Sequence, residues 1–289
     1  DAAVETFLGG NVRNPFFGLL PSNSTIGQPQ NIARERLLRP FPQFDTVSST
    51  TYEGYLWYHS GQFNLQKRFS QGYTVNVAYT WSKFMEATDL LNQSDPLPTE
   101  MISAFDSPHR LAVSWIYELP FGQGKAFGDT NNPILSRVLG GWQVSGIYAY
   151  QTGPPLNFTN NVIYLGGEIA LPEDQRTLER WFDITRFDRR TSPNVQPTAR
   201  NVRTFPFRFS DIRAQAANNV DISVSKNTAI TEGTKLQLRA DLINAFNRPW
   251  LLSGAAIGVN PAASNFGQVT AGNQANYPRR VQLMLKFIF

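Results

Sequence analysis

The sequence predicts an all-β protein, built as an antiparallel up-and-down β-barrel that crosses a membrane with its strands. Three observations indicate this fold class. Apolar residues recur with a period of two in seven segments of the chain. In the segments at 73–82 and 142–151 the alternate positions carry small or uncharged residues instead of the Lys and Glu of a solvated sheet, and along the chain short connections alternate with long ones.

Composition excludes several classes of protein. Only 17% of the 289 residues are charged and 41% are hydrophobic, which indicates a folded chain. No run of about 18 apolar residues predicts a membrane-crossing helix. With no Cys and two His, neither a disulfide framework nor a metal site is expected. The net charge of +4 is too small to indicate nucleic acid as a partner.

Four strands are predicted within residues 55–151. Residues 55–69 place Trp57, Phe63, Leu65 and Phe69 on one side. In YTVNVAYTWS, residues 73–82, every odd-numbered position is Tyr, Val or Trp. LAVSWIYEL at 111–119 and WQVSGIYAY at 142–150 repeat this pattern.

Three further strands are predicted within residues 219–289. They lie at 219–226, 234–246 and 281–289. The last one, VQLMLKFIF, aligns Val281, Leu283, Leu285, Phe287 and Phe289 on one face. An alternating apolar run at a chain end needs an apolar partner, and lipid would supply it.

The connections predict that one rim of the barrel carries large loops. Residues 70–72 and 227–233 are short turns, and a Gly- and Pro-containing connection of intermediate length follows residue 119. The long connections are residues 87–109, 152–218 and 247–278. Residues 1–50 show no sustained period, so they are interpreted as another long extracellular loop rather than a domain.

A soluble β-sandwich also has alternating strands and is kept as an alternative. Aromatic spacing favours the membrane barrel. Tyr73 and Trp81 are eight residues apart, about 27 Å along a strand and roughly 20 Å vertically at a tilt near 40°. An apolar band about 25 Å tall between two aromatic girdles has this dimension.

Seven strands are not expected to close into a barrel. Every backbone N–H and C=O must be paired inside a bilayer, so a spanning sheet has no free edge. Bacterial single-chain barrels have an even number of strands. We therefore predict that the chain is the carboxy-terminal segment of a larger barrel.

Several phrases of the sequence match one known family. The chain resembles the barrel of TonB-dependent outer-membrane receptors, particularly the Oar-like group. The matching stretches, which reach from near the start to the last residue, are NVRNPFFG (11–18), RPFPQF (39–44), LQKRFSQGYTVNVAYTWSK (65–83), FDSPHRLAVSWIYELPFGQGK (105–125), LGGWQVSGIYAYQTGPPL (139–156), LQLRADLINAFNRP (236–249), FGQVT (266–270) and PRRVQLMLKFIF (278–289).

The resemblance implies a barrel of about 22 strands in the bacterial outer membrane, with a plug and a TonB-contacting segment upstream that are not recognisable in these residues. It implies ligand binding and uptake without enzymatic chemistry or cofactors. The implied partners are outer-membrane lipid, the insertion machinery, the TonB complex through the upstream plug, and an unknown ligand. Phe287 and Phe289 would form the assembly signal. The alternative is a structural or interaction barrel, used in adhesion or protein export.

The long loop between Arg176 and Arg213 is the predicted ligand contact. It interleaves nine Arg with six Trp or Phe residues, a combination that grips anionic or planar ligands. The proposed contact residues are Arg186, Arg189, Arg190, Trp181 and Phe187. Neutralising the three Arg is expected to weaken uptake by the intact receptor. The alternative is a self-packed loop whose Asp and Glu residues offset the charge.

Two motifs are interpreted as structural. FGQGKAFG resembles a phosphate cradle, but no strand-to-helix unit surrounds it, so a Gly-rich turn is predicted. Asp106, Ser107 and His109 have the residue types of a hydrolase triad. Such triads are assembled from distant positions, so we expect positioned residues where a loop meets a strand, and no catalytic site.

Overall fold

The computed structural model describes residues 2–22, 24–44, 46–129, 132–158, 163–188, 202–250, 257–261, 263–270, 274 and 276–289. The chain divides into two compact units, Asp1–Glu53 and Gly54–Phe289.

The first unit contains short elements. They are α1 (Ala2–Gly9), β1 (Asn11–Arg13), β2 (Asn31–Ala33) and α2 (Arg34–Leu37), with β1 and β2 antiparallel. The buried Asn14 donates from Nδ2 to the carbonyl oxygens of Ile26 and Pro29, at 2.6 and 2.7 Å. The sequence predicts a long loop here. Elements of three to eight residues are too short to show a period, and the structure gives a compact unit instead.

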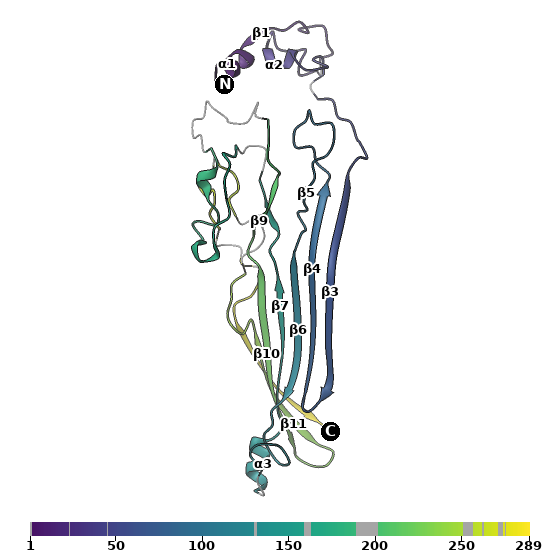
Figure 1. Cartoon of the computed structure of the whole chain (residues 1–289), viewed down its shortest axis with the longest axis vertical. Helices are drawn as coiled ribbons and strands as arrows, with labels where there is room; N and C mark the ends of the chain where they lie inside the picture. The colour runs from purple at the N-terminus through teal and green to yellow at the C-terminus, as the bar shows by residue number, and fades with distance from the viewer. Residues whose placement is uncertain are drawn as a thin grey trace. The chain divides into compact units, whose positions relative to one another are not determined.

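The second unit is built on an antiparallel meander (Figure 1). Among the described residues, long strands occur at all seven predicted places: β3 (Tyr55–Ser70), β4 (Tyr73–Ala87), β6 (His109–Glu118), β7 (Trp142–Gln151), β10 (Ala217–Ala229), β11 (Lys235–Ile243) and β12 (Arg280–Ile288). Each pairs with the next along the chain, and the short β5 (Met101–Ile102) joins β4. The prediction of an all-β antiparallel sheet is confirmed.

Short and long connections lie at opposite ends of this sheet (Figure 1). At the short-turn end, Gln71 and Gly72 join β3 to β4 with φ values of 56° and 85°, as a type I′ hairpin turn requires. The carboxy terminus of the chain and α3 (Pro133–Leu139) lie at the same end. The sequence did not predict α3. No helix within the described ranges has the length and apolar character to span a bilayer.

The register separates the side chains of the sheet into two faces. Val77 lies opposite Leu65 and Val113, and Leu238 lies opposite Leu285, so one face is continuously apolar. Among the described residues of the seven long strands, no Leu, Ile, Val, Phe, Tyr or Trp is buried. Leu283, for example, is 78% exposed. An exposed apolar face of this extent needs an apolar environment.

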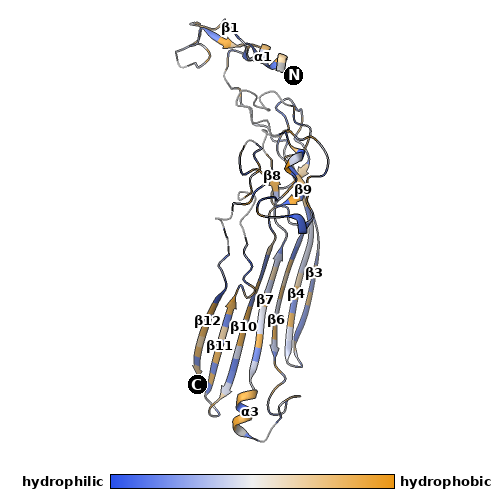
Figure 2. Cartoon of the chain, turned by 90° about the vertical axis from the view of Figure 1, so that its left-hand side faces the viewer, coloured by the Kyte–Doolittle hydropathy of each residue, from blue (hydrophilic) through white to orange (hydrophobic). Residues whose placement is uncertain are grey.

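The sheet is open. Its order, β12-β11-β10-β7-β6-β4-β3, leaves β3 and β12 as the outer strands, and the described residues show no pairing between them. The strands form one sheet rather than the two packed layers of a sandwich (Figure 2). The predicted size of about 22 strands stays a prediction.

The main hydrophobic core of the second unit lies in its long loops. We call this part the loop module, defined as the described residues within 152–216 and 257–270. It contains β8 (Pro155–Asn157), β9 (Arg208–Arg213) and the 3-10 turns η1 (Glu173–Gln175) and η2 (Ile184–Arg186). Its buried core consists of Leu156, Phe158, Ile169, Phe182, Phe187, Phe205, Ile212, Ala214, Ile257, Phe266 and Val269.

Candidate functional site

Aromatic rings form the centre of the loop module. The ring of Phe158, which is fully buried, lies 5.5 Å from that of Phe182 and 5.2 Å from that of Phe187. Phe266, from the last long connection, is 5.3 Å from both Phe182 and Phe187. Edge-to-face and offset arrangements at these distances are favourable beyond the area they bury. The two longest connections therefore share one core.

Three of the six loop arginines that the structure describes are buried within this module. Arg203 donates from Nη2 to the carbonyl oxygens of Phe158 and Pro206, both at 3.1 Å, and its guanidinium lies 4.2 Å from the ring centre of Phe205. Burial lowers the pKa of Arg203 to about 10. The backbone N–H of Arg203 donates to Asn92 Oδ1 at 2.7 Å, which joins the module to the loop after β4.

Arg208 and Arg213 connect the module to the sheet. Arg208 Nη2 donates to Glu86 Oε1 in β4, and its Nε donates to the carbonyl oxygen of Ile102 at 2.9 Å. Arg213 Nη2 donates to Asp106 Oδ2 at 2.6 Å, where both side chains are almost fully buried. Asp106 Oδ1 in turn accepts from the backbone N–H of Phe84 in β4 at 2.6 Å. Because isolated buried charges are costly, these pairs fix the module to the strand ends.

Asp106, Ser107 and His109, in the DSPHR segment at 106–110, make separate contacts. Asp106 binds Arg213, and Ser107 Oγ donates to the carbonyl oxygen of Thr152 at 3.0 Å. His109 Nδ1 is 2.8 Å from the hydroxyl of Tyr79. The motif joins a loop to the ends of the strands, and its side chains are not arranged as a triad.

The predicted ligand-contact residues have different environments. Phe187 is only 3% exposed and belongs to the core, so its place in the structure is packing. Trp181 packs against this core and donates from Nε1 to the carbonyl oxygen of Arg213 at 2.7 Å. Arg189 and Arg190 lie outside the described residues. Arg186 is half-exposed and is therefore available to a ligand.

Arg186 shares a carboxylate with a second arginine. Asp183 lies 3.3 Å from Arg186 Nε and 3.7 Å from Arg180 Nη2, and both guanidinium groups are partly exposed. Burial raises the pKa of Asp183, but the hydrogen bonds from Thr185 and the two positive charges outweigh this effect, so the pKa is lower than usual. The cluster of Arg180, Asp183 and Arg186 carries one net positive charge, which suits an anionic group.

The two residues predicted as the assembly signal are accessible. Phe287 lies on the apolar face opposite Leu236 in the register of β11 and β12. Phe289 follows β12 and is almost fully exposed. Their role in assembly stays a prediction.

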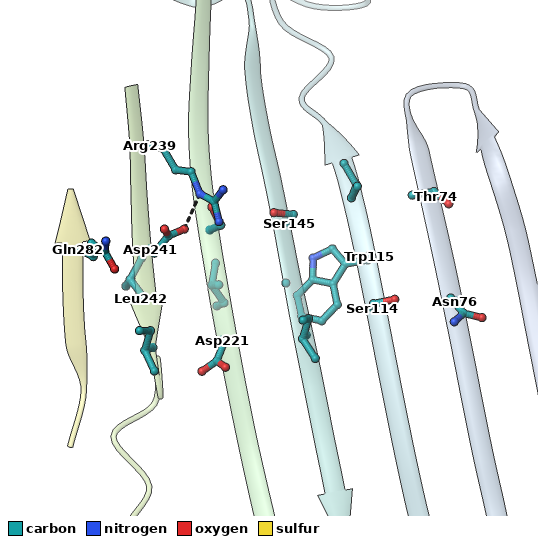
Figure 3. A pocket seen from close by; sticks show the side chains of 16 residues that line it. Thr74, Asn76, Ser114, Trp115, Ser145, Asp221, Arg239, Asp241, Leu242 and Gln282 are labelled. Carbon is teal, nitrogen blue, oxygen red and sulfur yellow. Dashed lines mark hydrogen bonds and ion pairs between the residues drawn. The ribbon is translucent and has the colours of Figure 1, made fainter. Parts of the chain in front are cut away.

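A groove of about 510 Å³ runs across the sheet, and Figure 3 shows its polar side chains. Its polar lining is Thr74, Asn76, Ser114, Ser145, Asp221, Ser223, Arg239, Asp241 and Gln282. Arg239 Nε donates to Asp241 Oδ1 at 2.7 Å, and Asp221 Oδ1 accepts from the N–H of Asn244 at 2.8 Å. The sequence predicts small polar residues on this face but does not single out these charges. Among the described residues, no group of three His, Asp or Glu could hold a metal ion.

Comparison with known proteins gives one family. The family model described as an outer membrane beta barrel domain matches residues 7–282, which is nearly the whole chain. Neither the curated proteins nor the solved structures gave a match.

Proposed function

We propose that this chain, which belongs to the family of outer membrane beta barrel domains, forms the carboxy-terminal barrel wall of a TonB-dependent receptor that binds a ligand and takes it up. The family match places the protein in the outer membrane. The finer assignment rests on the Oar-like phrases of the sequence, and the separation of the two sheet faces supports it.

The separation of the faces is the observation that carries the proposal. Leu65, Val77 and Leu283 share the apolar face, which suits contact with lipid. The opposite face of the sheet carries Ser145, Asp221 and Asp241. A lumen-facing wall with a groove of polar and charged groups can make hydrogen bonds to a folded plug, whereas the lipid face cannot.

The open edges of the sheet support a larger barrel. In a bilayer, the outward N–H and C=O groups of β3 and β12 would each lack a partner at considerable cost. Further strands must pair with both edges. A barrel of about 22 strands, as the resemblance implies, satisfies this requirement.

The loop module is the proposed ligand-binding rim. Long loops of outer-membrane barrels face the outside and short turns face the periplasm, so the module is assigned to the extracellular side. Its buried arginines fix the fold of the rim. Arg180 and Arg186 remain partly exposed and offer positive charge to an anionic ligand.

Photo-crosslinking in the native protein tests the proposal. A benzophenone side chain at Ser145, on the polar face, is expected to crosslink to a plug upstream in the same polypeptide. The matched position is Tyr148, whose register places it on the apolar face and which should crosslink to lipid. The intact mass of the protein extracted from outer membranes should lie well above 32.5 kDa. A mass near 32.5 kDa, with no internal crosslink from Ser145, would contradict the receptor assignment.

A barrel for adhesion or protein export is the second candidate, and the rigid packing of the loop module favours it as a surface for binding another protein. Conductance in planar bilayers separates the two candidates. A plugged receptor is expected to show no steady current. A barrel of similar size without a plug would conduct ions continuously.

A further inference from the structure

The helix α3 presents apolar side chains to its surroundings. Ile134 is 75% exposed, and Leu135 and Val138 are also exposed. Phe121 and Phe127, in the same connection between β6 and β7, add two exposed rings whose centres are 5.9 Å apart. Figure 2 shows the helix, largely in the hydrophobic colour, at the short-turn end of the sheet. An exposed apolar surface of this kind indicates contact with another protein or with a membrane.

Residues of the lipid-facing register hold α3 in place. Lys226 Nζ donates to the carbonyl oxygens of Arg137, Val138 and Gly140, at 2.8, 2.9 and 2.6 Å. Trp142 Nε1 donates to the carbonyl oxygen of Val138 at 3.1 Å, and the Lys226 ammonium lies 5.0 Å from the Trp142 ring.

Lys226 and Trp142 are register partners, and they share the face of Val224, Val144 and Leu238. The carboxy-terminal end of α3 is therefore tied to the lipid-facing side of the sheet rather than to its polar side.

The two anchoring residues also indicate a depth in the membrane. Trp is enriched at the membrane–water interface, and Lys extends its ammonium to the polar boundary while its stem stays in apolar surroundings. The ammonium at the end of α3 also matches the negative end of the helix dipole. Lys226 and Trp142 lie at the short-turn ends of β10 and β7. The carboxy-terminal end of α3 therefore lies where the apolar band of the sheet ends.

We propose that α3 is an interfacial helix, lying on the periplasmic leaflet of the outer membrane with Ile134, Leu135 and Val138 inserted among the lipids. The argument uses the position of the barrel in the outer membrane and not the ligand uptake proposed above. Apolar side chains in the boundary between headgroups and acyl chains bind a helix to the membrane surface. The helix extends the lipid contact of the barrel beyond its strands.

Fluorescence quenching tests this placement. Residues 1–289 contain no Cys, so Ile134→Cys and Leu135→Cys each provide one site within them for a bimane label. The full-length protein is used, with any Cys outside these residues changed to Ser. The protein is reconstituted in vesicles of phosphatidylethanolamine and phosphatidylglycerol. A nitroxide attached to the lipids near the headgroup is expected to reduce the emission at both sites, and aqueous iodide is expected to have little effect.

Two reference positions calibrate the result. Leu283→Cys, on the apolar face of β12, should respond to lipid nitroxide, and the exposed Glu232→Cys, in the turn after β10, should respond to iodide. If Ile134 and Leu135 behave like Glu232, the helix lies in water and the proposal is wrong. If neither quencher reaches them, a protein covers the helix, which also overturns lipid contact. Iodide quenching at Leu283 would instead contradict the lipid-facing assignment of the sheet.

Lys226 is the positioning residue, and its substitution gives a second measurement. In Lys226→Ala, the label at Ile134 is expected to gain access to iodide because the end of α3 is released. In Lys226→Arg, which keeps the donors, the label should stay in lipid. The label at Leu283 should be unaffected in both variants, which shows that the barrel is folded. An unchanged response of Ile134 in Lys226→Ala would contradict the anchoring role.

Discussion

The loop module buries its apolar side chains within the chain, whereas the sheet leaves its apolar side chains exposed. In the module, Phe158, Phe182 and Phe266 bury one another within the chain. In the sheet, Leu65, Leu283 and Phe287 remain exposed along one face. The module therefore carries its own hydrophobic core, as a soluble domain does. The sheet depends on lipid for its apolar face and on further strands for its edges.

The same contrast holds for charged groups. The module buries Arg203, Arg208 and Arg213, each satisfied by carbonyl or carboxylate oxygens. The sheet keeps Arg239 and Asp241 in an open groove on its polar face. A substitution in the aromatic core of the module should thus act on the module alone, whereas the two faces of the sheet should respond differently to the same added charge.

The largest effect is expected from Phe158→Ala. Loss of a fully buried ring costs about 3–5 kcal/mol, so the module should unfold locally while the strands stay protected. Hydrogen exchange of the full-length protein would show faster exchange in β8 and β9 and unchanged exchange in β4 and β6. The matched control, Phe105→Ala, removes a ring that is 82% exposed and should leave the exchange unaltered. Faster exchange in β4 and β6 would mean that the two regions are not separate.

Asp106→Ala should destabilise the attachment of the module by about 3–5 kcal/mol, because it leaves the buried guanidinium of Arg213 without its carboxylate. The double variant Asp106→Ala, Arg213→Met should lose less stability than Asp106→Ala alone, because no buried charge is left unpaired. The unfolding of the module in urea, followed by hydrogen exchange at β9, compares the two. A greater loss in the double variant would contradict a role as a charge pair.

Adjacent residues of β12 test the two faces of the sheet. Leu283→Arg places a charge in lipid and should reduce the stability of the folded barrel by about 2–4 kcal/mol. Gln282→Arg places it on the polar face, opposite Asp241, and should change stability within about 0.5 kcal/mol. Urea titration of the full-length protein in vesicles measures both. Equal losses would remove the distinction between the faces.

The smallest effect concerns the pH dependence of the Arg180, Asp183 and Arg186 cluster. The pKa of Asp183 is lower in the folded protein than the ordinary value near 4. The ionised Asp183 therefore stabilises the folded module at pH values above about 4, and this stabilisation is lost as the pH falls through the lower pKa of the folded state. The contribution should be below about 1 kcal/mol because the pair is partly exposed. The urea midpoint of the module should differ between the native protein and Asp183→Asn at pH 7, and this difference should shrink as the pH is lowered through the folded pKa of Asp183. A difference that does not shrink on acidification would contradict an ionic origin.

Much of the sheet could be predicted because its signal is local. Tyr73, Val75 and Val77 alternate with polar residues, and successive strand residues point to opposite faces whatever the rest of the chain does. The turn at Gln71 and Gly72 is equally local. The helix α3 was missed because seven residues inside a Gly- and Pro-containing connection give a short pattern, and its anchor at Lys226 lies 86 residues from Gly140.

The sequence by itself determined the strands, their two faces and the rim that carries the long loops, because a period of two and the spacing of turns follow from the order of residues. Only the tertiary structure decided which loop residues are buried. Phe187 lies in the core although its neighbour Arg186 is accessible. Arg208 and Arg213 meet Glu86 and Asp106, which are 122 and 107 residues away. The environment of a charge depends on partners that the fold brings together, and no local pattern records them.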